Sequence, residues 1–141
     1  MFMIEPVESK AMQMLLAGEH PTLELLREQF KHAQIKSRDF TGVGFFTEFE
    51  IGGGGPKVKP PKRYIISDVC ADVDGLEFGC GFILFIADGL ISTLECHLWG
   101  DDALPDSARY TRFYYFHQPE PPGIKETKNR DMDFVSKMLG I

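Results

Sequence analysis

The sequence of 141 residues has no long hydrophobic run, no basic N-terminal segment and few cysteines. No apolar stretch approaches the roughly 20 residues that a membrane-spanning helix requires, so we expect no membrane association. The N-terminus (MFMIEPVESK) lacks the basic start and apolar core of a signal peptide. Together with the odd number of three cysteines, this predicts a cytoplasmic protein with reduced thiols.

Positive charge is also scarce. The chain has 15 Lys and Arg residues against 21 Asp and Glu residues, which gives a formal net charge of −6. Non-specific nucleic-acid binding needs a cationic surface, so we expect no nucleic-acid partner. The acidic charge permits a basic protein partner.

The remaining composition is typical of one globular domain. Hydrophobic residues make up 43% of the chain and charged residues 26%, as in folded proteins. We find no internal repeat and no linker, so residues 1–141 predict a single domain. Cys70, Cys80 and Cys96 lie in apolar, strand-like surroundings, and we interpret them as small buried hydrophobic residues.

The strongest local pattern is a hairpin within residues 81–99 (GFILFIADGLISTLECHLW). Two apolar runs flank Asp88-Gly89, and such a pair suits a two-residue type I′ turn, in which both central residues have a positive φ. The cross-strand pairs predicted from this turn are Ala87 with Leu90, Phe85 with Ser92, and Phe82 with Glu95.

The wider pattern places helices before strands. Apolar residues at helical spacing predict two N-terminal helices, over residues 7–17 and from His20 to about Ala33, and a short C-terminal helix within residues 129–139. Alternating or apolar runs at residues 40–51, 64–73 and 109–117 predict further strands. We therefore expect an α+β fold in which the N-terminal helices pack on the concave side of a curved antiparallel sheet of five or six strands. This arrangement often leaves a pocket between the layers.

Three segments carry a family resemblance. They are residues 41–47 (TGVGFFT), residues 75–86 (GLEFGCGFILFI), and Asp88-Gly89 followed by residues 94–96 (LEC) and 99–101 (WGD). Over residues 40–104, this pattern resembles a small family of uncharacterised bacterial proteins. Related short sequences occur beside polymorphic toxin systems, where small acidic α+β proteins serve as immunity partners. The resemblance implies protein binding, with immunity-type inhibition of a toxin as its specific form.

One pair of residues could carry chemistry. Glu95 and His97 are two apart on a predicted strand, so their side chains share a face, and Asp101 follows closely. A carboxylate beside an imidazole can support general acid–base catalysis, or hold a metal with a further aspartate. A polar sheet face explains the same residues and is the interpretation we favour, so no catalytic residue, metal or cofactor is expected. Cys96 adjoins His97 but must point to the other face, which argues against a Cys–His dyad.

Other residues of the strands allow two interpretations each. Large aromatic side chains at Trp99, Tyr110 and Tyr114 could line a ligand pocket or a protein interface, or could belong to the core. The even spacing of the aspartates predicts one shared face, where a solvated strand edge is favoured over a cation site; they are Asp68, Asp72 and Asp74.

We therefore carry three functional hypotheses. The first is a non-enzymatic protein-binding domain, and the alternative is a small-ligand-binding or hydrolase-like domain that uses Glu95 and His97 in a pocket between helix and sheet. The third is a structural homodimer formed through an exposed edge strand such as residues 109–116. The predicted ligand or partner site comprises Glu95, His97, Trp99, Asp101, Tyr110 and Tyr114.

Overall fold

Three helices and seven strands make up the computed structural model, which describes residues 2–53, 55–100, 103–105, 107–117 and 125–140. The helices are α1 (Pro6–Leu15), α2 (Pro21–Phe30) and α3 (Met132–Met138). The strands are β1 (Ala33–Phe40), β2 (Gly44–Ile51), β3 (Tyr64–Val73), β4 (Cys80–Ala87), β5 (Leu90–Leu98), β6 (Tyr110–His117) and β7 (Lys125–Thr127). The predicted α+β class and the short C-terminal helix are confirmed.

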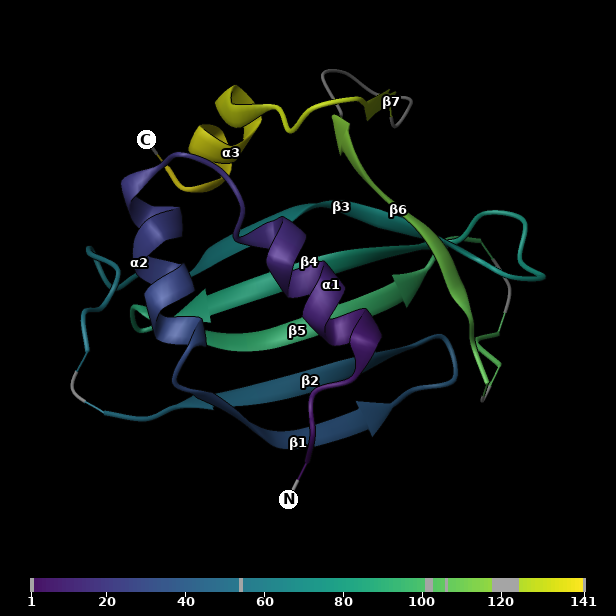
Figure 1. Ribbon diagram of the computed structural model, residues 1–141, viewed down its shortest axis with the longest axis horizontal. Coiled ribbons are helices and arrows are strands. Elements are labelled where there is room, and N and C mark those ends of the chain that lie inside the picture. The colour runs from purple at the N-terminus through teal and green to yellow at the C-terminus, as the bar shows by residue number, and fades with distance from the viewer. Residues whose placement is uncertain (1, 54, 101–102, 106, 118–124, 141) are drawn as a thin grey trace.

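All seven strands join one antiparallel sheet in the order β1-β2-β5-β4-β3-β6-β7 (Figure 1). The predicted count of five or six strands is wrong. Two strands account for the difference: β1, whose residues 33–40 the sequence does not predict as a separate strand, and β7, which is three residues long and pairs only with the end of β6. Three residues are too few to show an alternating pattern, so only the pairing reveals β7.

Both N-terminal helices begin at a proline, where the missing N–H costs no helical hydrogen bond. Before α2, His20 occupies the N-cap position and its Nδ1 accepts a hydrogen bond from the Thr22 amide at 3.1 Å. Figure 1 shows α1 and α2 lying across one face of the sheet, with α3 beside them along β3. Among the described residues, no helix lies on the opposite face (Figure 1).

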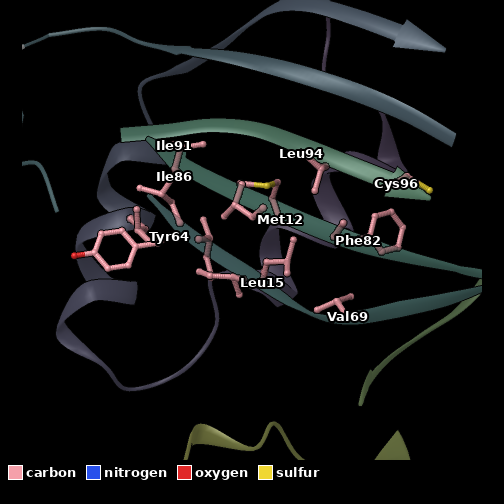
Figure 2. Close-up of a cluster of buried hydrophobic side chains, with 14 of the residues drawn as sticks. Met12, Leu15, Tyr64, Val69, Phe82, Ile86, Ile91, Leu94 and Cys96 are labelled. Carbon is pink, nitrogen blue, oxygen red and sulfur yellow. The ribbon is translucent and has the colours of Figure 1, made fainter. Parts of the chain in front are cut away.

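The core fills the space between the helices and the sheet. Helix residues such as Met12 and Leu15 contact strand residues that point toward them, among them Val69, Phe82 and Leu94 (Figure 2). All five of these side chains are fully buried. Burying a side chain of this size stabilises the fold by about 1.5–3 kcal/mol, so this layer is the main source of stability.

The central hairpin has the predicted turn. Asp88 has a φ of 54° and Gly89 a φ of 81°, and Ala87 pairs with Leu90 as expected. The two other predicted pairs are wrong, because an irregularity follows the turn and shifts the register by one residue. The observed partners are Thr93 for Phe85 and Cys96 for Phe82.

A side chain from α2 explains why the hairpin is irregular there. Gln29 is buried, and its Oε1 accepts a hydrogen bond from the Ile91 amide at 2.9 Å. Its Nε2 donates to the Gly89 carbonyl at 2.7 Å. The irregularity also lets Ile91 and Leu94, three positions apart, both face the helices. A regular strand would have sent one of them to the other face.

The three aspartates of the predicted shared face do not lie together. A second irregularity, in β3 between Ile66 and Val69, separates Asp68 from Asp72. Asp68 is fully buried and forms an ion pair with Arg130, whereas Asp72 is part of an exposed ion pair with Arg112. Asp74 lies exposed in the turn after β3. The prediction of one shared face is therefore wrong.

No helix in the described part of the chain is both long enough and apolar enough to cross a membrane.

Candidate functional site

Four of the predicted site residues lie on the face of the sheet that no helix covers. Glu95 and His97 alternate along β5 with Leu94 and Cys96, which belong to the core on the helix side. Trp99 follows on the same side as His97, since the two rings contact each other with centroids 4.9 Å apart. The predicted common face of Glu95 and His97 is confirmed.

We call this surface the helix-free face. Its side chains alternate with core residues along the strands, and most are only partly exposed although no helix covers them. Its residues include Ser37, Asp39, Phe46, Glu48, Glu50, Ile65, Cys70, Asp72, Ile83, Phe85, Thr93, Glu95, His97, Trp99, Arg112, Tyr114 and Phe116.

Small residues form a row at the centre of the helix-free face. Gly81 pairs with His97 on one side and with Cys70 on the other, and Cys70 pairs with Tyr114. A Cβ atom added at Gly81 would lie 2.8 Å from the His97 ring and 2.9 Å from the Trp99 ring. The absence of a side chain at Gly81 thus lets both rings pack closely over the sheet at this position.

The aromatic rings continue toward β6. The Trp99 ring contacts Phe116 edge to face, with centroids 6.5 Å apart. Tyr114 lies two residues before Phe116 on β6, and the Arg112 guanidinium lies 4.3 Å from the centroid of the Tyr114 ring. Neither Trp99 nor Tyr114 is fully buried, so both remain available as contact residues.

His97 has the properties of a neutral packing residue. Its Nδ1 atom is buried and has no hydrogen-bond partner among the described residues. Burial lowers the pKa of the imidazole, and the charge of Glu95 opposes this shift only in part. The ring is therefore neutral at pH 7. No hydrogen bond joins it to Glu95 in the described part of the chain, so the geometry of a catalytic pair is not formed.

All three cysteines are buried and free, as predicted. Burial raises the pKa of the Cys70 thiol to about 12, in a site where Trp99 and Tyr114 also contact it. Contact with Cys96 together with burial raises the pKa of the Cys80 thiol. A nucleophilic cysteine needs a lowered pKa, so neither environment favours thiol catalysis. Cys96 faces the helices while His97 faces away, which confirms that the two cannot form a dyad.

Acidic residues border the aromatic rings on the side of β1, β2 and β5. Glu95 lies opposite Phe46, which lies opposite Asp39, so two carboxylates flank one phenyl ring. Within the described ranges, Asp39, Glu50 and Glu95 form no ion pair with Lys or Arg. This half of the helix-free face therefore carries uncompensated negative charge.

Tyr110 does not belong to this surface. The strand pairing is irregular between Asp72 and Val73, which pair with Arg112 and Tyr110 respectively. Thr111 is thus an extra residue, and it turns Tyr110 toward the helices, where its ring lies 6.3 Å from the buried Phe82 ring. Asp101, the sixth predicted site residue, lies outside the described residues.

Sequence reasoning expected a pocket between helix and sheet that uses Glu95 and His97, and this placement is wrong. A cavity of about 860 Å³ opens between the first half of α1, the turn that joins β1 to β2, and the start of β6. We call it the helix-side pocket. Its lining includes Val7, Lys10, Phe45, Arg109, Tyr110 and Phe113. Glu95 and His97 lie on the other side of the sheet and do not line it.

No group of three or more His, Cys, Asp or Glu side chains in the described part of the chain is arranged to hold a metal ion.

The chain matches none of the protein-family models, curated proteins or solved structures with which it was compared. The family resemblance drawn from residues 40–104 stays a prediction.

Proposed function

We propose that this protein is a non-enzymatic binding domain whose helix-free face docks onto a protein with a basic surface. The observation that carries the proposal is a cluster of large apolar side chains on a sheet face without helices. Antiparallel sheets that face water on one side normally place polar residues there. Here the central strand β4 places Ile83 and Phe85 on this face. Trp99 packs beside them after the end of β5, and Ile65 on β3 is 41% exposed.

The composition of this face fits a protein interface. Aromatic side chains at the centre supply contact area, and charged residues at the rim supply orientation and selectivity. Trp and Tyr are the residues that most often contribute strongly to binding, and Trp99 and Tyr114 both contact Cys70 on this face. The uncompensated carboxylates of Asp39, Glu50 and Glu95 favour lysine and arginine on the partner.

A second copy of the chain fits this surface less well. In a face-to-face dimer the same carboxylates would approach one another, which is unfavourable. Among the described residues, two arginines lie over rings of this surface: Arg63 over Phe85, and Arg112, which is already paired with Asp72 and Glu126, over Tyr114. The homodimer through β6 is also weakened, because β6 pairs with β3 on one side and with β7 at its end.

The more specific form of the proposal is that the partner is a toxin that this protein inhibits. The resemblance to the bacterial family beside toxin systems supports it, as does the acidic surface. We also propose a cytoplasmic location, supported by three cysteines that are buried and unpaired.

Site-specific photo-crosslinking tests the proposal. The photoreactive residue p-benzoylphenylalanine is placed at Ile83 on the helix-free face or, as a control, at the exposed Gln13 on α1, and the chain is irradiated in its own cells. We expect one basic protein to be captured from Ile83 and not from Gln13. The double variant Glu48→Lys, Glu95→Lys should lose the adduct, whereas Glu24→Lys, Glu28→Lys on α2 should keep it.

Three results would overturn the proposal: no adduct from Ile83, equal adducts from both positions, or an adduct with a second copy of the chain. If the captured protein stops growth when it is expressed alone, and this chain restores growth, the toxin form of the proposal is supported. If it does not affect growth, that form is wrong while the docking proposal stands.

A further inference from the structure

The helix-side pocket lies on the opposite side of the sheet from the proposed docking face, so it is a separate site. Its walls come from α1, from the β1–β2 turn, from residues 104–105 and 108–109, and from β6. A volume of about 860 Å³ is within the range of pockets that bind small molecules in proteins.

The floor of the helix-side pocket is aromatic. Phe113 stacks on the buried Phe82 with centroids 5.7 Å apart and an angle of 17° between the rings. The Tyr110 ring lies beside Phe113, with centroids 6.4 Å apart, and Phe45 of β2 also lines the floor. Rings that are held by neighbouring rings keep their positions, so the floor is formed before any ligand arrives.

The charged groups at the rim differ in their partners. Arg38 is held by Glu8 through two hydrogen bonds, at 2.6 and 2.9 Å, so these two charges cancel. Lys10 and Arg109 line the same pocket, and neither has an ion-pair partner among the residues that the structure describes. Among the lining residues that the structure describes, Glu5 is the one further carboxylate. Two cations against one carboxylate leave an excess of positive charge in this described part of the lining, in a protein that is acidic as a whole.

We propose that the helix-side pocket binds an organic anion that has an apolar body and a single carboxylate or similar head group. The apolar body lies on Phe45, Tyr110 and Phe113, where its contact with water is lost. The head group lies at the rim between Lys10 and Arg109, where a charge-assisted hydrogen bond to the guanidinium holds it. The pocket binds this molecule without transforming it.

Two probes test the proposal on the full chain: 1-anilinonaphthalene-8-sulfonate, an aromatic anion whose fluorescence rises in apolar sites, and dodecanoate as its competitor. We expect binding with a stoichiometry of one. Dodecanoate should displace the dye at least about tenfold more effectively than dodecanol, which has the same alkyl body without the charge; this difference corresponds to about 1.4 kcal/mol. In a nitrogen–proton correlation spectrum, the amide shifts should occur at Val7, Phe45 and Phe113 and not at Ile83 or Trp99.

Variants separate the head-group site from the pocket itself. The double variant Lys10→Gln, Arg109→Gln changes two exposed side chains, so it should fold normally and bind dodecanoate at least about fivefold more weakly, which is a loss of about 1 kcal/mol. The matched control Lys36→Gln, Lys128→Gln removes the same charge from exposed positions outside the lining and should bind like the original chain. Ala108→Phe places a ring in the pocket and should abolish binding.

Other results would overturn the proposal. Equal displacement by dodecanol and dodecanoate would show that no anion is selected. If Lys10→Gln, Arg109→Gln binds the dye as well as the control variant does, these two cations do not hold the head group. Amide shifts at Ile83 and Trp99 would place the dye on the helix-free face. Absence of binding by both probes would mean that the helix-side pocket is not a site for this class of molecule.

Discussion

At the scale of single residues, Glu8 is the most constrained charge in the protein. Its side chain is 1% exposed and lies between α1 and the sheet, where Arg38 of β1 and Thr47 of β2 both donate hydrogen bonds to it. The Glu5 amide donates a further one at 2.8 Å. Burial by itself would raise the pKa of Glu8, but the hydrogen bonds from Arg38, Thr47 and Glu5 together lower it below 4.5. The carboxylate is therefore charged and fully partnered in the folded protein.

Removing the cation from this site should destabilise the fold. We expect Arg38→Met to lower the free energy of unfolding at pH 7 by about 3–5 kcal/mol, because Glu8 then remains buried without its counter-charge. Urea unfolding followed by circular dichroism measures the change. Lys31→Met is the control, since it breaks an exposed ion pair with Glu28 and should cost less than about 1 kcal/mol. Equal losses in the two variants would contradict this view of Glu8.

The same variant has a defined pH dependence. In the original chain the folded-state pKa of Glu8 is below its unfolded value of 4.5, so its contribution is fully present above pH 4.5 and is lost as the pH falls through the folded pKa. In Arg38→Met, burial dominates and raises the pKa of Glu8. The stability difference between the two proteins should therefore be largest near neutral pH and should shrink in acid, where both carry a protonated Glu8.

At the scale of elements, side chains from helices set the details of the sheet. The turn at Asp88-Gly89 could be predicted, because a positive φ at adjacent positions is a local property of these residue types. The register beyond it could not. It depends on Gln29, which is 62 positions before Ile91 in the chain yet accepts its amide hydrogen bond. A pattern of alternating residues contains no information about such a partner.

The hairpin anchor can be tested at Gln29. We expect Gln29→Leu to lower the free energy of unfolding by about 1–3 kcal/mol, because the Ile91 amide and the Gly89 carbonyl lose buried hydrogen bonds. Hydrogen exchange at the Ile91 amide should accelerate more than at Leu84, in the middle of β4. Gln13→Leu on the exposed side of α1 serves as the control and should leave stability within about 0.5 kcal/mol. A cost no greater than that of the control would show that Gln29 does not anchor the hairpin.

Irregular strands also decided which candidate residues come together. Glu95 and His97 share a face because no extra residue lies between them. Tyr110 and Tyr114 do not share a face, because Thr111 is an extra residue between them in β6. A similar irregularity in β3, between Ile66 and Val69, separates Asp68 from Asp72. The shared face of the candidate site could thus be predicted within a regular strand and not across an irregular one.

At the scale of the whole molecule, Arg130 connects the two ends of the chain to the sheet. Its guanidinium donates two hydrogen bonds to the Asp68 carboxylate, at 2.8 and 2.9 Å, and a third to the Ala17 carbonyl at 2.6 Å. It also lies 5.3 Å from the centroid of the Tyr115 ring. This one side chain therefore holds the segment before α3, the end of α1 and strands β3 and β6 in one arrangement.

Breaking this connection should have effects beyond Arg130 itself. We expect Arg130→Met to lower the free energy of unfolding by about 3–5 kcal/mol, because Asp68 stays buried without a partner. Amide exchange should accelerate most in α3, which is attached through this segment. Arg112→Met is the matched control: it breaks two ion pairs, with Asp72 and Glu126, but these are exposed and should contribute about 1 kcal/mol or less. A loss similar to that of the control, or exchange that accelerates uniformly, would contradict the proposed role of Arg130.

The sequence alone determined the features that depend on neighbouring residues: the α+β class, the three helices, the Asp-Gly turn, the buried cysteines and the common side of Glu95 and His97. Each follows from backbone preferences or from periodicity over a few positions. The tertiary structure decided what depends on residues far apart in the chain. Gln29 meets Gly89 across 60 positions, and Ala17 meets Arg130 across 113. Contacts of this kind set the register of the strands, leave one face of the sheet without helices and enclose the helix-side pocket, and no local pattern contains them.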